Sequence, residues 1–447
     1  MKPRGFILTD ISLEEPDDKQ SLIRLLLYSN EIELEGLIST SSTWLKVNGT
    51  SFRPDLIYKV IDAYAAVVEN LRYHDPDYPD ADYLRNLVAV GNDNTMVSVG
   101  TGKSSPGSEM LIRALEKEDA RPLWVLIWGG SSTLAQALFD IRERYTSGRC
   151  AELISRLWVY DIQGQDDAGA WCTNQFPNLH YIRSQYQFRG MSNRVDGVWQ
   201  EARGVYDEFG ESEWFAKHIQ QGKGPLGAIY PNANYMFEGD TPSFLHLVPT
   251  GLHEPEKIDQ GGWGGRFDSY RKRNIWSGGC PVNDESAWGE FELFSDAGDL
   301  YYHHLSKAPT IDVYHPVSRW RNAYQHDFAA RMGWCTKSFE DANHPPVVVV
   351  NGDETDDVLC ITVKPGDMVT CDASQSHDPD GDGLSFHWWF YREPGTFRQL
   401  PEIKVTDHSM MTFTMPDEPG ELHLICEVWD DGEPPLVRYR RMILTAV

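Results

Sequence analysis

Apolar and polar positions follow two different periods along this chain, and the change from one to the other divides it. Up to about residue 338, short apolar runs alternate with stretches in which apolar residues recur at helical spacing. This alternation predicts a mainly parallel β-sheet wrapped by helices, an α/β domain over residues 1–340. Its expected strands are 5–9, 34–39, 87–90, 123–128 and 157–162, and its expected helices are 22–28, 56–71, 109–115, 134–144 and 320–334.

Two further segments have a different character. Between residues 163 and 316 the pattern gives way to stretches rich in Gly, Trp and Asn, which predict long loops of the kind that carry function over an α/β sheet. After a polar linker at 343–346, seven short alternating runs predict an antiparallel, immunoglobulin-like β-sandwich domain over residues 345–447. Its expected strands are 347–350, 359–363, 368–372, 385–390, 412–415, 422–429 and 438–444.

Composition and charge narrow the range of partners. Forty basic against 67 acidic residues give a formal charge of −27, which repels nucleic-acid phosphates and anionic membrane surfaces. We therefore expect no nucleic-acid and no membrane partner, and a small-molecule ligand instead. Aromatic residues make up 12% of the chain, either as core packing or as a sugar-binding surface. Nine residues precede Asp10, so the chain as given predicts a cytoplasmic protein, or a secreted or periplasmic one if a leader was removed.

The cysteines indicate no metal or disulfide framework. Seven are scattered without a C-x-x-C pair. Cys371 and Cys426 fall on expected sandwich strands, where a bridge in an oxidising compartment and two core thiols in a reducing one both remain open. Nearby, the loop 374–383, SQSHDPDGDG, is similar to an acidic loop of polycystic-kidney-disease-type modules and indicates a tight acidic turn or a calcium site.

Three aspartates near the start of the chain suggest chemistry. Asp10 ends the first apolar run, and Asp17 and Asp18 open the helical stretch that follows. The carboxyl end of a strand is where α/β sheets place ligands, so the three side chains should gather there. Carboxylates brought together repel one another unless a cation lies between them, and oxygen ligands favour a hard divalent ion such as calcium. The alternative is that Asp17 and Asp18 are ordinary first-turn acids favoured by the helix dipole.

These segments resemble a known family. Thr-Asp at 9–10 followed by Glu-Pro-Asp-Asp at 15–18 is similar to a stretched D-x-D-P-G-x-D-D signature of calcium-dependent nucleoside hydrolases. The similarity is closer to their relatives described as cellulose-binding proteins, which pair a nucleoside-hydrolase-like domain with an immunoglobulin-like domain. Further matching segments are 125–135 (VLIWGGSSTLA), 165–171, 238–245 (EGDTPSFL), 261–266 and 327–332.

The resemblance implies a Ca²⁺ site and an activity. Hydrolysis of a glycosyl bond passes through an oxocarbenium-like state and needs a positioned water with a base. Calcium acidifies water only weakly, so a carboxylate must take the proton, and Asp10 is the candidate catalytic base. The implied metal ligands are Asp10, Asp18, Asp240 and the carbonyl of Ser132, and the implied substrate-binding residues are Asp17, Asn174, Asp166, Trp171, Trp263 and Glu238.

Simpler roles remain open for some of these residues. Asp240, before Thr-Pro-Ser, could be an ordinary helix N-cap. Trp263, between glycine pairs, suits a loop anchor as well as a sugar-stacking platform, and Asp166 suits a solvated loop acid.

The chain also departs from the nucleoside hydrolase pattern. Leu8 replaces the first aspartate of the signature, the loop before Asp17 is longer, and Gly239 stands where many nucleoside hydrolases carry a histidine that assists the departing base. The first functional hypothesis is therefore a calcium-dependent hydrolase of glycosyl bonds, foremost N-glycosyl bonds of a nucleoside-like molecule. The second is a non-catalytic carbohydrate-binding protein, for cellulose or a related polysaccharide, with a structural or vestigial metal site. A sensor of a nucleotide-like ligand is a third, and assembly into a homo-oligomer stays open.

Overall fold

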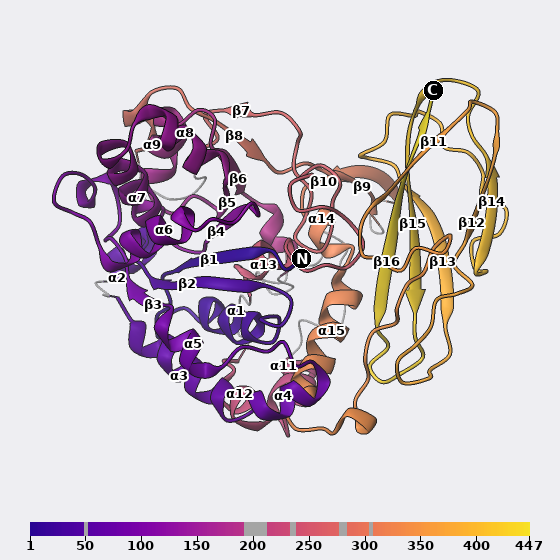
Figure 1. The fold of residues 1–447 in the computed structure, drawn as a ribbon, viewed down its shortest axis with the longest axis horizontal. Coiled ribbons are helices and arrows are strands. Elements are labelled where there is room, and N and C mark those ends of the chain that lie inside the picture. Colours follow the sequence, from indigo (N-terminus) through magenta and orange to yellow (C-terminus); the bar gives the residue numbers. More distant parts are fainter. Residues whose placement is uncertain (49–51, 192–211, 233–237, 277–283, 304–306) are drawn as a thin grey trace.

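Two lobes make up the protein in the computed structural model, which describes residues 1–48, 52–191, 212–232, 238–276, 284–303 and 307–447 (Figure 1). The larger lobe holds an eight-stranded sheet in the order β3-β2-β1-β4-β5-β6-β8-β7. All neighbours in it pair in parallel except β7 with β8, so the predicted mainly parallel sheet is confirmed. Its strands are β1 Arg4–Thr9, β2 Glu33–Ser39, β3 Val88–Val90, β4 Leu123–Ile127, β5 Leu157–Ile162, β6 His180–Ser184, β7 Lys272–Arg273 and β8 Glu292–Ser295.

Helices cover both faces of this sheet, and each face has its own apolar core. Neighbouring residues of β1 point to opposite faces, so Ile7 joins one core and Leu8 the other. The first core is closed by α1, α3, α13 and α15, and the second by α6, α7, α8 and α9. The helices are α1 Asp17–Leu26, α2 Thr43–Asn48, α3 Pro54–Ala65, α4 Val68–His74, α5 Ala81–Asn86, α6 Pro106–Glu116, α7 Ser132–Arg144, α8 Ser147–Ser155, α9 Ala168–Gln175, α11 Ser212–Phe215, α12 Gly224–Ile229, α13 Thr241–Leu245, α14 His315–Ser318 and α15 Arg321–Trp334, with a π-turn, η4 Ala216–Gln220, after α11. None of these helices is long and apolar enough to cross a membrane.

The segment expected to be mostly loop contributes strands to the sheet. Both β6 and β8 lie in it, and β6 pairs in parallel with β5 and β8. The apolar pattern did not reveal β6 because Arg183 occupies a fully buried position on it. That charge is balanced by Asp161 and Glu285, each 2.9 Å from a guanidinium nitrogen.

The smaller lobe is the predicted all-β unit. A four-stranded sheet, β11-β16-β15-β13, stands beside the pair β12-β14, and their neighbours are antiparallel except β11 with β16. The expected first strand, 347–350, forms only isolated bridges. Cys371 and Cys426 are free thiols in this core, and Cys280 lies outside the described residues. The strands are β11 Leu359–Val363, β12 Met368–Asp372, β13 Ser385–Tyr391, β14 Met410–Thr414, β15 Gly420–Trp429 and β16 Val437–Ala446. A hairpin of the larger lobe is formed by β9 Asp299–His303 and β10 Ala308–Asp312.

A polar and aromatic interface joins the lobes, with α15 between the large sheet and the sandwich (Figure 1). The Tyr391 hydroxyl donates to Asp299 at 2.5 Å, and Arg438 pairs with Asp327 of α15 at 2.8 Å. Arg441 of β16 donates to the carbonyls of Gln260 and Gly261 in the larger lobe. These hydrogen bonds and this ion pair hold the sandwich against the α/β lobe.

His246, buried under the sheet, makes stability depend on pH. Its Nε2 lies 2.9 Å from the Pro255 carbonyl, and burial lowers its pKa to about 4. As the pH falls, His246 of the unfolded chain is protonated near pH 6.5, whereas His246 of the folded chain is protonated only near pH 4. The free energy of unfolding therefore decreases as the pH falls from about 6.5 to about 4. We expect the stability advantage of the wild type over His246→Gln to shrink by about 2 kcal/mol between pH 7 and pH 4.5. Urea unfolding of both proteins at both pH values measures this difference in the free energy of unfolding. A difference that does not change with pH would contradict the lowered pKa of His246.

Candidate functional site

Three parallel strands end at one pocket. Asp10 follows β1, Trp128 follows β4, and Gln163 follows β5, and all three line it. The amino end of α1 brings in Asp17 and Asp18, and the turn before α13 brings in Asp240. The pocket thus lies at the carboxyl edge of the sheet, where the sequence placed it.

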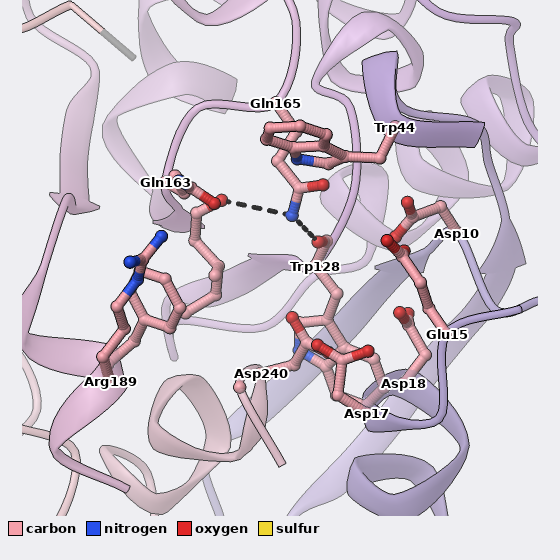
Figure 2. Close-up of a pocket in the computed structure, with 13 residues that line it drawn as sticks. Asp10, Glu15, Asp17, Asp18, Trp44, Trp128, Gln163, Gln165, Arg189 and Asp240 are labelled. Carbon is pink, nitrogen blue, oxygen red and sulfur yellow. Dashed lines mark hydrogen bonds between the residues drawn. The ribbon is translucent and has the colours of Figure 1, made fainter. Parts of the chain in front are cut away.

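The three expected carboxylate ligands, Asp10, Asp18 and Asp240, meet in this pocket, and Asp17, which was expected to bind substrate, lies with them. One oxygen each of Asp17, Asp18 and Asp240 lies within 4.8 Å of the others, and the three side chains are buried. Asp10 is also buried and lines the same space, and the Thr9 hydroxyl donates to Asp18. Figure 2 shows the acidic groups together on one side of the pocket, with Arg189 and Gln163 on the other. Asp240 stands at the N-cap position of α13 without a capping hydrogen bond, which excludes the ordinary N-cap role.

The cluster is electrostatically unfavourable as it stands. Asp10 Oδ2, Asp17 Oδ1 and Asp240 Oδ2 are buried without a hydrogen-bond partner. Burial, with the charge of Asp17 adding to it, raises the pKa of Asp10 to about 7. Burial followed by the neighbouring carboxylates raises the pKa of Asp18 and of Asp240 well above the usual range. Orphaned, convergent carboxylate oxygens are the donor set that a hard divalent cation takes, so the residues fit calcium.

The remaining wall of the pocket combines rings, amides and one cation. Its volume is about 140 Å³. Gln163, which lines this wall, adopts φ +72°, a left-handed conformation that is strained for a residue other than glycine. A side chain at Gly239 would be tight against the acids, because a Cβ there would lie 3.1 Å from Asp17 Oδ2. The other lining residues are Glu15, Trp44, Trp128, Ile162, Gln165, Phe188 and Arg189.

Several of these lining residues had not been singled out. Glu15 and Trp128 lie inside the matching motifs, and Gln163 follows directly on an expected strand, so position alone could have flagged them. Trp44 and Arg189 carry no signal in the sequence. Burial and the charge of Asp10 raise the pKa of Glu15 to about 8, so this carboxyl stays protonated near neutrality when no cation is bound.

Ser132 and Asp166 support the pocket from behind and are not among the residues that line it. The backbone N–H of Ser132 donates to Asp166 at 3.1 Å, and that of Ala168 donates to the same carboxylate at 3.0 Å. Gly130 allows this approach, since a Cβ there would lie 2.6 Å from Asp166 Oδ2. Asp166 is therefore a buried residue that does not line the pocket. Its hydrogen bonds hold the glycine turn that follows β4. Trp128, at the start of that turn, does line the pocket.

Four other expected substrate-binding residues lie elsewhere. Asn174 donates to the Glu290 carbonyl at 2.7 Å, and Trp171 packs in the apolar core beside Phe176. Trp263 is fully buried under the Arg438 guanidinium, so the loop-anchor role holds. Glu238 is buried in an ion pair with Arg24 at 2.5 Å. None of the four is among the residues that line the pocket.

Comparison with known proteins agrees with this architecture. A family model described as cellulose-binding Sde182, nucleoside hydrolase-like domain, matches residues 4–267. The chain belongs to this family. A second model, the C-terminal domain of cellulose-binding protein Sde0182, matches residues 368–446, so both lobes of the Sde182 family are present. The resemblance stated from the sequence is confirmed.

The fold is also similar to that of a solved structure. The chain is similar to a nucleoside hydrolase-related hypothetical protein from Saccharophagus degradans that is associated with carbohydrate metabolism, with 33% identity over 100% of both chains and a TM-score of 0.87. The PapD-like domain of human CEP192 matches 23% of the chain over 85% of its own length, with 12% identity and a TM-score of 0.16, which is too low to indicate a shared fold. No curated protein matched the sequence.

Proposed function

We propose that the acidic pocket binds one calcium ion and hydrolyses a glycosyl bond, foremost an N-glycosyl bond. The observation that carries the proposal is the convergence of buried, partly orphaned carboxylates at the carboxyl edge of the sheet. Membership in a nucleoside hydrolase-like family supports the same reaction class. Asp10, Asp17, Asp18 and Asp240 would hold the ion, which when bound would supply a fixed positive charge to orient a water and sugar hydroxyls.

Asp10 is the base of this reaction. Its unpartnered Oδ2 faces the pocket and can accept a proton from water as the water oxygen bonds to the anomeric carbon. The bond from that carbon to the leaving group breaks, and the leaving group takes the bonding electron pair. Solvent protonates the leaving group, and Asp10 returns to solvent the proton that it took from the attacking water. Developing positive charge on the sugar is favoured by the surrounding carboxylates.

The wall opposite the acids orients the substrate. Trp44, Trp128 and Phe188 line the pocket, and aromatic residues there suit a sugar or a planar leaving group. Gln163 and Arg189 face the acidic cluster across the pocket (Figure 2). An amide and a guanidinium there suit an oxygen-rich leaving group, which gains negative charge as the bond breaks. Gly239 offers no imidazole to assist a departing base, and Arg189 is the cationic side chain on the wall opposite the acids (Figure 2).

A substrate panel tests the activity. Purine and pyrimidine nucleosides and aryl glycosides are incubated with the full chain in calcium and in chelator, and the released base or phenol is measured. We expect turnover of at least one member in calcium and at least a tenfold loss in chelator. Absence of turnover across the panel, or turnover that ignores calcium removal, would reject the hydrolase.

Carbohydrate binding without turnover is the second candidate. The family description names cellulose binding, and Leu8, buried in the apolar core, replaces an acid of the nucleoside hydrolase signature. Sedimentation of the full chain with cellulose distinguishes the candidates. Retention on cellulose with no turnover in the panel would favour this second function, and failure to be retained would remove it.

A further inference from the structure

A second pocket, of about 200 Å³, opens where the larger lobe meets the smaller one. Its floor is the small-residue face of α15, formed by Ala329, Ala330 and Gly333. One wall comes from η4 and the turn after it, and the other from Glu433 and Pro434 of the smaller lobe. Among the residues that the structure describes, none lines both this junction pocket and the acidic pocket.

Three lysines converge on the junction pocket. Lys217, Lys223 and Lys337 all line it. Lys223 Nζ lies 3.8 Å, and Lys337 Cε 3.9 Å, from the position that a Cβ of Gly333 would occupy. A Cβ at Gly333 would therefore touch both lysine side chains at ordinary van der Waals distance, so the glycine keeps the space beside the two lysines open.

These ammonium groups are not neutralised by the described part of the chain. Acids outnumber bases by 67 to 40 in this protein, yet no described carboxylate forms an ion pair with any of the three lysines. Glu433 lines the pocket as well, and no ion pair joins it to any of these lysines. Burial and the charge of Lys337 both lower the pKa of Lys223. Two like charges held together in half-buried positions repel, and an anion between them removes the repulsion.

We propose that the junction pocket binds a compact dianion of the phosphate monoester type, held by Lys223 and Lys337 with Lys217 at the mouth. Two ammonium groups match the charge of a dianion, and lysine binds phosphate as a point charge. The small floor residues limit the ligand to a compact group. Since Asn343, Glu433 and Pro434 complete the walls, the ligand would touch both lobes and stabilise their association.

Titration of the full chain with inorganic phosphate tests the proposal. In calcium-free buffer of constant ionic strength, we expect a saturable rise in melting temperature and a calorimetric signal with phosphate, and no saturable response to acetate, a monoanion. The double variant Lys223→Met/Lys337→Met should bind phosphate at least tenfold more weakly. The matched control Lys364→Met/Lys404→Met, with two exposed lysines of the smaller lobe, should bind like the wild type.

Three results would overturn the site. They are no saturable response to phosphate, an equal response to acetate, and undiminished binding by the double variant. Each single variant, Lys223→Met and Lys337→Met, is expected to weaken binding at least threefold, so the site stays testable if the double variant does not fold. As the control for folding, the circular dichroism spectrum of each variant must match that of the wild type.

Discussion

Asp10→Asn is expected to lower turnover of the best substrate of the panel by about 10² to 10⁴-fold, the range of a positioned general base. The amide keeps the shape of the side chain but cannot accept the proton of the attacking water. Asp10 is buried with an unpartnered Oδ2, and its charge contributes to the repulsion within the cluster. Initial rates of wild type and variant in saturating calcium give the measurement.

Two controls separate this effect from loss of the fold. Asp82→Asn removes an exposed acid that pairs with Arg85 on α5, and should leave turnover unchanged. In chelator, Asp10→Asn should melt no lower than wild type, because it removes one charge from a group of carboxylates that repel one another. A variant that melts lower and is equally active would contradict both the catalytic role and the electrostatic account.

Glu238→Gln is expected to destabilise the larger lobe by about 3–5 kcal/mol, the cost of leaving a buried charge without its partner. Arg24 and Glu238 are both fully buried and pair at 2.5 Å, and the Tyr230 hydroxyl donates to the same carboxylate at 2.8 Å. The ion pair lies directly before Gly239 and Asp240, so its loss should also weaken calcium binding. Urea unfolding followed by tryptophan fluorescence measures the stability.

The double variant Arg24→Met/Glu238→Met is the matched comparison. Removing both charges leaves no unpaired ion in the core, so it should be less destabilising than Glu238→Gln alone. The single variants Arg24→Met and Glu238→Met complete the cycle. A double variant that loses as much stability as the sum of these two losses would show that the buried pair is not the source of the effect.

The sequence located the acids well because their positions follow from topology. Asp10 ends a strand, and Asp17 and Asp18 open the next helix, so the carboxyl edge of a parallel sheet brings them together. Asp240 could be placed with them only through the family resemblance, since more than 200 residues separate it from Asp18. The core strands were predictable for the same reason: their apolar runs are long and buried on both faces.

The sequence predictions that were wrong concern residues whose roles depend on contacts with distant residues. A tryptophan between glycines looks alike as a sugar platform and as a core anchor, and only the packing of Arg438 over Trp263 decides it. Glu238 was assigned to substrate because Arg24, its partner, lies 214 positions away. The strand β6 was missed because its buried Arg183 is neutralised by acids from other elements.

Calorimetric titration of the full chain with calcium is the most direct measurement of the central claim. The account predicts a binding event in the wild type that is absent from Asp18→Asn/Asp240→Asn, a variant that removes two of the converging carboxylates. A wild type that takes up no calcium, or a double variant that binds it as tightly, would contradict the account.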